Sequence, residues 1–228
     1  MRHWIPFIAD TYSDVMDDGP ERLIGLCMAP QYSSLSIGAY MKKVEEARAR
    51  LGGDFPVTFV QSWHVHPLLI QAIVDNVTQA LQKFPAEVRA EVPLLFTAHS
   101  LPERILQMKD PYPDEVRATV DAVCRLLGKP EARFAFQSQG RSDEPWLGPT
   151  VEETLESLQT EGHRHVLVAP IGFISDHLEV LYDVDIQFKA FAVARGMRLE
   201  RIAMLNASGP LIETLASVLH EHETARTA

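Results

Sequence analysis

Cysteine, basic charge and long apolar runs are scarce in this sequence, and each shortage excludes a class of protein. Only Cys27 and Cys124 are present, with no Cys-x-x-Cys pair, which indicates a reduced, cytosolic protein rather than a disulfide-stabilised one. The 21 basic residues are outnumbered by 31 acidic ones, which gives a net charge of −10. This balance argues against nucleic acid or an anionic membrane surface as a bulk electrostatic partner.

No apolar run is long enough to cross a bilayer. The longest, 166–174, has about half the required length and contains Pro170 and Gly172. The first residues soon meet several aspartates, so we expect no signal peptide, whereas peripheral contact with a membrane stays open. Hydrophobic residues make up 46% of the chain, which suffices for one large domain or two small ones with a true core.

Short β-rich runs alternate with helical patterns along the chain. We expect strands at 22–28, 57–61, 92–98, 133–137, 166–169 and 199–204. Between them, apolar residues recur at helical spacing, as in 37–51, and Thr150 with Glu153 forms a capping box that opens a helix. This alternation predicts an α/β protein with parallel sheets and helices on both faces.

Two carboxylates, Glu179 and Asp183, lie four residues apart in an otherwise apolar run. On a helix this spacing places both on one face. Apolar neighbours such as Leu178 and Leu181 should remove water from the carboxylates and raise their pKa, so that they hold protons or bind a cation near neutral pH. The plain alternative is a pair of solvated charges near the start of a helix.

His99 ends the apolar strand expected at 92–98 and is followed by a turn. In a parallel sheet, ligands bind at the carboxyl ends of the strands, so His99 lies where chemistry is expected. The commoner role of a lone histidine at a strand end is structural, as a hydrogen-bonded residue. On the sequence motif alone, both interpretations stay open.

These two motifs, with several others, resemble the ferrochelatase family, whose members insert iron into a porphyrin. The other motifs are 137–140, 145–149 and 170–175, with Ala29-Pro30 near the start and Leu205-Asn206 near the end. They occur in the family's order and at similar separations, and the resemblance covers essentially all 228 residues.

The resemblance implies a chelatase-like fold of two Rossmann-like α/β lobes with parallel sheets. We expect a partial first lobe at 1–85, completed by a C-terminal helix at 207–228, and a second lobe at 86–206 that carries the metal-side residues. Family members ordinarily begin with a further βα segment that nothing here matches. The first lobe should therefore be incomplete, with an open sheet edge and exposed apolar surface.

The resemblance also implies roles for the polar residues. His99 and Glu179 match the family's facing catalytic pair on the metal side of the porphyrin, shared by proton abstraction and metal delivery. Asp183 matches a position that continues an acidic ridge along the helix, so we expect the metal to meet His99, Glu179 and Asp183. Where some relatives carry another acid, this chain has Gln187, whose amide cannot take up a proton. The outer end of the ridge is therefore in doubt.

Three further residues have two interpretations each. Trp146 matches a wall of the porphyrin pocket but could plug the core, and Tyr40 matches a porphyrin-contacting tyrosine but could be a buried helix residue. His177 lies two residues from Glu179, so the two should not share a helix face. We expect His177 to support the site or cap the helix.

The function implied is insertion of Fe²⁺ into protoporphyrin IX or coproporphyrin III in heme biosynthesis. Porphyrin and ferrous iron are the substrates, no prosthetic group is implied, and two cysteines cannot supply the four thiolates of an iron–sulfur cluster. Without the family's opening segment, we expect the chain to be a poor or inactive chelatase. Two alternatives stay open: a non-catalytic remnant that binds porphyrin or metal, and a cobalt or nickel chelatase.

Overall fold

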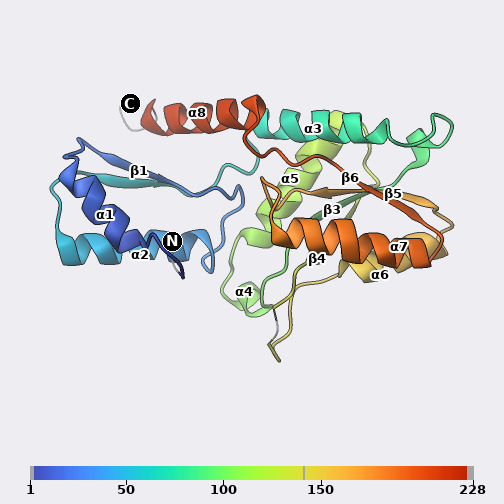
Figure 1. The fold of residues 1–228 in the computed structure, drawn as a ribbon, viewed down its shortest axis with the longest axis horizontal. Coiled ribbons are helices and arrows are strands. Elements are labelled where there is room, and N and C mark those ends of the chain that lie inside the picture. Colours follow the sequence, from blue (N-terminus) through green and yellow to red (C-terminus); the bar gives the residue numbers. More distant parts are fainter. Residues whose placement is uncertain (1–2, 141, 225–228) are drawn as a thin grey trace. The chain divides into compact units, whose positions relative to one another are not determined.

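The computed structural model describes residues 3–140 and 142–224, and its chain divides into two compact units (Figure 1). The first unit contains the residues up to Trp63 and those from Leu215 onward. The second unit comprises His64–Thr214. In the described residues, no helix is both long and apolar enough to cross a membrane.

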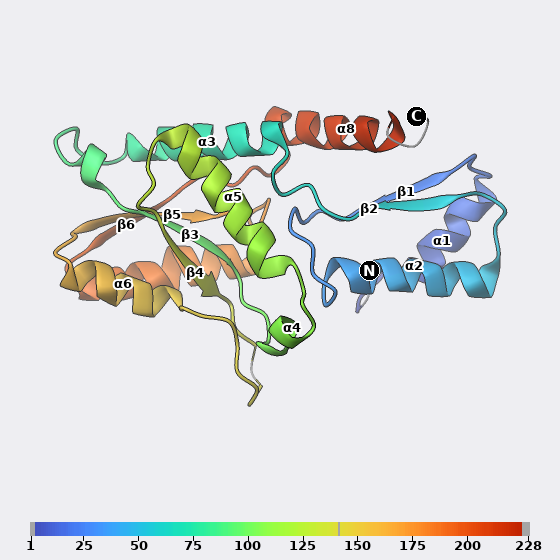
Figure 2. The ribbon, with the colours of Figure 1, turned by 180° about the vertical axis from the view of Figure 1, so that it is seen from behind.

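The first unit has a parallel pair of strands, β1 (Leu23–Leu26) and β2 (Val57–Val60), with Leu23 opposite Val57. Its helices are α1 (Ile8–Asp17), α2 (Ile37–Leu51) and the later part of α8 (Gly209–Thr224). Figures 1 and 2 place α2 and α8 on opposite faces of this sheet. The contact with α8 includes a 3.1 Å hydrogen bond between the His222 Nε2 and Thr58 Oγ1 atoms.

The second unit contains a parallel sheet with strand order β4-β3-β5-β6. The strands are β3 (Leu94–His99), β4 (Arg133–Gln137), β5 (His165–Pro170) and β6 (Arg198–Arg201). The two central strands, β3 and β5, are buried along nearly their whole length, as expected of a parallel sheet covered on both faces. All six expected strands are present, and the predicted α/β class is confirmed.

Helices cover both faces of this sheet, with α3 and α5 on one side and α6 and α7 on the other (Figures 1 and 2). The helices are α3 (Pro67–Leu81), α4 (Arg104–Gln107), α5 (Tyr112–Leu127), α6 (Val151–Thr160), the π-helix η2 (Val180–Phe188) and α7 (Lys189–Ala194), with a 3₁₀ turn η1 (Arg89–Glu91). The predicted capping box opens α6: the Glu153 amide donates to the Thr150 hydroxyl, and the Thr150 amide donates to the Glu153 carboxylate.

The π-helix fits the core through residues spaced four apart. Val180, Val184 and Phe188 are buried, and the last two join a core cluster with Leu155 of α6 and Val168 of β5. A four-residue repeat of buried side chains is compatible with a π-helix and with an α-helix. Burial of this stripe therefore anchors η2 to the core, and the sequence pattern did not distinguish it from an α-helix.

The grouping of elements differs from the boundary expected near residue 85. Helix α3 belongs to the second unit because its apolar side contacts α5 and β5. Its buried residues include Leu69, Ile73 and Val77. The C-terminal helix begins at Gly209 rather than 207, and its first turns also belong to the second unit.

Candidate active site

A glycine brings the segment after β5 directly over the end of β3. A Cβ atom added to Gly172 would lie 2.7 Å from the Cβ of Ala98, which is closer than side chains approach. The Gly172 amide also donates to the Thr97 carbonyl oxygen at 3.2 Å. This crossing places the chain that leads to Glu179 beside His99.

His99 and Glu179 face each other, as the sequence predicts. The His99 Nε2 and Glu179 Oε2 atoms are 3.6 Å apart. The other ring nitrogen, Nδ1, contacts the Ser100 carbonyl oxygen, which can only accept a hydrogen bond. Nδ1 therefore carries the fixed proton, and Nε2 is the atom that gains or loses one. The Tyr112 hydroxyl donates to the His99 carbonyl oxygen at 2.9 Å and holds the backbone there.

His177 lies on the other side of the same carboxylate oxygen. Its Nε2 atom is 3.6 Å from Glu179 Oε2, and its Nδ1 atom is 3.1 Å from the Ser175 carbonyl oxygen. The Phe173 ring contacts both imidazoles, with centroids 6.3 Å from His99 and 4.7 Å from His177. Since His177 precedes the helix, the argument from helix faces does not apply to it, and the sequence analysis missed this contact.

The two pKa values of the facing pair shift apart. Burial opposes protonation of His99, but the facing negative charge of Glu179 outweighs burial and raises the pKa of His99. The close approach of His99 lowers the pKa of Glu179 against the effect of burial, and the nearby His177 lowers it further. Each group thus favours the charged form of the other.

The expectation that apolar neighbours raise the pKa of Glu179 was wrong. Leu178 is 80% exposed and Leu181 is 44% exposed, so these side chains point to solvent rather than covering the carboxylate. The Glu179 side chain itself is 44% exposed. Its histidine neighbours therefore decide the direction of the shift.

Asp183 reaches the end of the neighbouring strand β4. Its carboxylate accepts a hydrogen bond from the Ser138 hydroxyl, which in turn accepts one from the Gln137 amide at 3.3 Å. Gln137 is buried, and its amide oxygen accepts from the Thr97 hydroxyl at 2.7 Å. Glu179 and Asp183 thus both face the strand ends, as their spacing predicts. Ser138 has a left-handed backbone with φ of 59°, a conformation that is uncommon outside glycine and often found at functional sites.

The outer residue of the expected ridge turns away from these carboxylates. The Gln187 side-chain amide donates to the Glu152 carboxylate of α6 at 3.3 Å. Among the described residues, no group of three or more His, Cys, Asp or Glu side chains is arranged to hold a metal ion. His99, Glu179 and Asp183 therefore do not form one closed cage.

Trp146 lies on a loop that is joined to the turn after His99. The Leu147 amide donates to the Leu101 carbonyl oxygen at 2.9 Å, and the Ser100 hydroxyl donates to the Leu147 carbonyl oxygen at 2.8 Å. The Trp146 ring is half-buried and lies against Gly140, where an added Cβ would come within 2.5 Å of it. Tyr40 is half-buried on α2 in the first unit. The porphyrin-contacting roles of both residues stay predictions.

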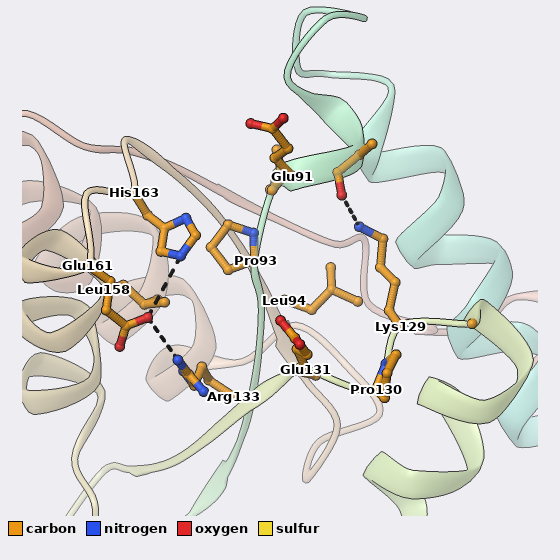
Figure 3. Close-up of a pocket in the computed structure, with 14 residues that line it drawn as sticks. Glu91, Pro93, Leu94, Lys129, Pro130, Glu131, Arg133, Leu158, Glu161 and His163 are labelled. Carbon is orange, nitrogen blue, oxygen red and sulfur yellow. Dashed lines mark hydrogen bonds and ion pairs between the residues drawn. The ribbon is translucent and has the colours of Figure 1, made fainter.

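A separate hollow of about 490 Å³ opens at the amino ends of β3 and β4 (Figure 3). Its cations already have partners. Arg133 pairs with Glu161 at 2.8 Å, and the Lys129 ammonium donates to the Ala90 carbonyl oxygen at 2.9 Å. In a parallel sheet this is the end opposite to the one where ligands usually bind.

Comparison with known proteins gives a single family, described as Ferrochelatase, whose pattern matches residues 1–223. The chain is 43% identical over 219 residues to a ferrochelatase of Herpetosiphon aurantiacus, and the match covers 96% of this chain and 72% of that protein. It is 40% identical over 230 residues to a ferrochelatase of Deinococcus radiodurans, covering 100% and 72%. It is 36% identical over 225 residues to a coproporphyrin III ferrochelatase of Listeria innocua, covering 98% and 72%.

A solved structure shares the fold at low sequence identity. SirB from Bacillus subtilis, solved with Fe3+, aligns with a TM-score of 0.67 at 9% identity, over 96% of this chain and 78% of that one. At that identity the likeness concerns the fold alone.

Proposed function

Since this chain belongs to the ferrochelatase family, we propose that it inserts Fe²⁺ into a porphyrin in heme biosynthesis, with His99 and Glu179 acting on the metal side of the ring. The observation that supports these roles is the 3.6 Å approach of the His99 Nε2 and Glu179 Oε2 atoms at the carboxyl end of β3.

The reaction needs both a base and a metal donor. Fe²⁺ replaces two hydrogens on the inner nitrogens of the ring, so two protons leave for each iron that enters. The Nε2 atom of neutral His99 can accept a proton or ligate iron, and the Glu179 carboxylate is a charged oxygen ligand at neutral pH. A site built from both groups serves proton removal and metal delivery in turn.

Charge coupling within the pair links these two steps. With no metal bound, the charge of Glu179 raises the pKa of His99 and makes it the better base. A ferrous ion next to Glu179 places a double positive charge beside the imidazole, which favours loss of its proton. Arrival of iron then drives the proton out and frees Nε2 as a ligand.

Delivery also requires that the ion leave the protein. Structural zinc sites hold their ion with four protein ligands, whereas a pair of donors leaves most of the coordination sphere to water and to the porphyrin nitrogens. Asp183, next along the same face, offers a further carboxylate for an incoming ion or an outgoing proton. Its hydrogen bond from Ser138 fixes its orientation toward the strand ends.

The porphyrin needs flat apolar walls, and we assign Trp146 and Tyr40 to them. Both side chains are half-buried, so part of each ring can contact a ligand. We place the reaction in the cytoplasm, which the two free cysteines, Cys27 and Cys124, support.

The decisive experiment is anaerobic iron insertion into protoporphyrin IX and coproporphyrin III by wild type, His99→Ala, Glu179→Gln and His163→Ala. His163 is a matched control, because it also lies near a glutamate, with its Nε2 atom 3.8 Å from Glu161 Oε2, but borders the hollow at the opposite end of the sheet. Loss of a positioned acid–base group should lower turnover about 10²- to 10⁴-fold in the first two variants, whereas His163→Ala should match wild type. Near-normal turnover by His99→Ala would rule out its role as base and ligand.

A further inference from the structure

Arg201, the last residue of β6, holds two aspartates that flank the candidate site in sequence. Its Nε and NH2 atoms donate to the two Asp185 carboxylate oxygens at 2.8 and 2.9 Å. Its NH1 atom lies 3.1 Å from Asp176 Oδ1. The Arg201 side chain is only 14% exposed, so these ion pairs are better shielded from water than surface pairs.

Asn206 completes the hold on Asp176 from the loop after β6. The Asn206 side-chain amide donates to Asp176 Oδ2 at 2.9 Å, and its oxygen accepts from the Asp176 backbone amide at 2.8 Å. Asn206 has a left-handed backbone with φ of 50°, which asparagine tolerates better than most residues. Asp176 is therefore fixed through its side chain and its backbone.

We propose that Arg201 is a positioning residue, which fixes both ends of the segment from Asp176 to Asp185 so that Glu179 and Asp183 stay aimed at the strand ends. The predicted effect of Arg201 on iron binding rests on the proposed function. Its predicted effect on the segment rests on the contacts alone. The Arg201 guanidinium links Asp176 to Asp185, nine residues later. The proposed donors Glu179 and Asp183 lie between these two contacts.

The segment needs this support because packing holds only one of its sides. The Val180 and Val184 side chains are buried, but Leu178 is 80% exposed and Glu179 is 44% exposed. A π-helix is moreover a rare conformation, found mostly as single turns within α-helices and frequently at functional sites. Ser138 fixes Asp183 from the sheet side, and Arg201 fixes Asp185 from the β6 side.

Arg201 has a second effect on the same chemistry. Asp176 and Asp185 are carboxylates within two or three residues of Glu179 and Asp183, and either could compete for a ferrous ion. A guanidinium that occupies both Asp185 oxygens and contacts Asp176 removes them as free ligands. Lysine could not match this, because an ammonium lacks the rigid fork that reaches two carboxylates at once.

The test compares Arg201→Met with Arg198→Met. Arg198 lies on the same strand, and it also pairs with a carboxylate, Glu200 at 2.9 Å, and donates to the Lys83 carbonyl oxygen at 2.8 Å, but it does not contact the segment. Hydrogen–deuterium exchange of the peptide over 174–188 reports on the segment without reference to activity. The KM for ferrous iron in the insertion assay reports on the donors.

Arg201→Met should exchange at least about tenfold faster in 174–188, with the core strand β3 unchanged. Its KM for iron should rise about 10- to 100-fold with porphyrin affinity retained, as is typical when groups that orient metal ligands are lost. Arg198→Met should change neither quantity. Arg201→Lys should fall between wild type and Arg201→Met, which keeps the test interpretable if the methionine variant folds poorly.

Unchanged exchange in 174–188 would overturn the proposal, and so would faster exchange spread over the whole of the second unit. Faster local exchange with an unchanged KM for iron would also overturn it, because the segment would then move without affecting the donors. If the wild-type protein did not insert iron, the proposed function would fall, while the exchange comparison would still decide whether Arg201 holds the segment.

Discussion

The two sheets of this protein differ in how fully they are buried. In the second unit, β3 and β5 are buried along almost their whole length, and both carry residues of the candidate site or lead into it. In the first unit, seven of the eight residues of β1 and β2 are only partly buried. Parallel strands are normally covered on both faces, so the second sheet is the stable platform and the first contributes less to its own stability.

Truncating a core residue in each sheet gives the largest predicted effect. Leu95 of β3 is fully buried and belongs to the core cluster, so Leu95→Ala should reduce the free energy of unfolding by about 2–5 kcal/mol. Ile24 of β1 is only partly buried, so Ile24→Ala should cost clearly less. Urea titration of both variants measures the difference. Equal losses of unfolding free energy would show that the two sheets do not differ in their contribution to stability.

Substitution of Asp183 tests whether the metal-side chemistry belongs to the second unit. Asp183→Asn keeps the shape and the contact with Ser138 but removes the charge, so iron turnover should fall about tenfold, less than in His99→Ala. Tyr40→Ala in the first unit should instead raise the KM for porphyrin. If Asp183→Asn proved as severe as His99→Ala, Asp183 would stand beside the reacting ring rather than farther along the helix.

Removing a helix cap tests the stability of the second unit without removing a proposed metal donor. Thr150→Ala deletes the hydroxyl that accepts from the Glu153 amide, and it should cost about 1 kcal/mol of unfolding free energy. The KM for iron should not change, because α6 carries none of the proposed donors. Thermal unfolding together with the insertion assay measures both, and a change in KM would show that α6 affects the metal side.

The smallest predicted effect is the pH dependence of the His99–Glu179 pair. Because the pKa of His99 is raised in the folded protein, His99 contributes fully to the free energy of unfolding below the usual histidine pKa of 6.5. This contribution is lost as the pH rises through the pKa of His99 in the folded protein. Because the pKa of Glu179 is lowered in the folded protein, Glu179 contributes fully to the free energy of unfolding above its usual pKa of 4.5. This contribution is lost as the pH falls through the pKa of Glu179 in the folded protein.

The pair should therefore stabilise the second unit most between about pH 4.5 and 6.5, by less than about 1 kcal/mol because both side chains are partly exposed. The stability difference between wild type and Glu179→Gln, measured from pH 4 to 8, should peak in that window. A difference that is flat with pH would show that the two groups do not interact.

Local sequence patterns predict most of the helices and strands. They do not predict which residues far apart in the sequence contact each other. Runs of apolar residues located all six strands, and Thr150 with Glu153 located the start of α6. The facing of His99 and Glu179 followed from a strand end and a family motif. The four-residue repeat of buried residues in η2 is compatible with either kind of helix, so the π-helix was not predicted.

The remaining gaps at the site have one physical origin. Arg201 and Asp176 are 25 positions apart in sequence, and a single long-range ion pair leaves no periodic trace. The direction of the Glu179 pKa shift depends on His99 and His177, and the positions of these side chains around the carboxylate are not visible in the apolar pattern of the sequence. Sequence patterns therefore predict which residues belong to a site better than they predict the solvent exposure of those residues.

Gly172 gives the spacing of the site an origin in the backbone. The chain leaving β5 crosses the end of β3 so closely that a methyl group at this position would meet Ala98. Substitution by alanine should push the segment after β5 away from Ala98, and we expect it to increase the 3.6 Å distance between His99 and Glu179 without removing an ionisable group. We therefore expect the distance between the two proposed donors to depend on a residue that has no side chain.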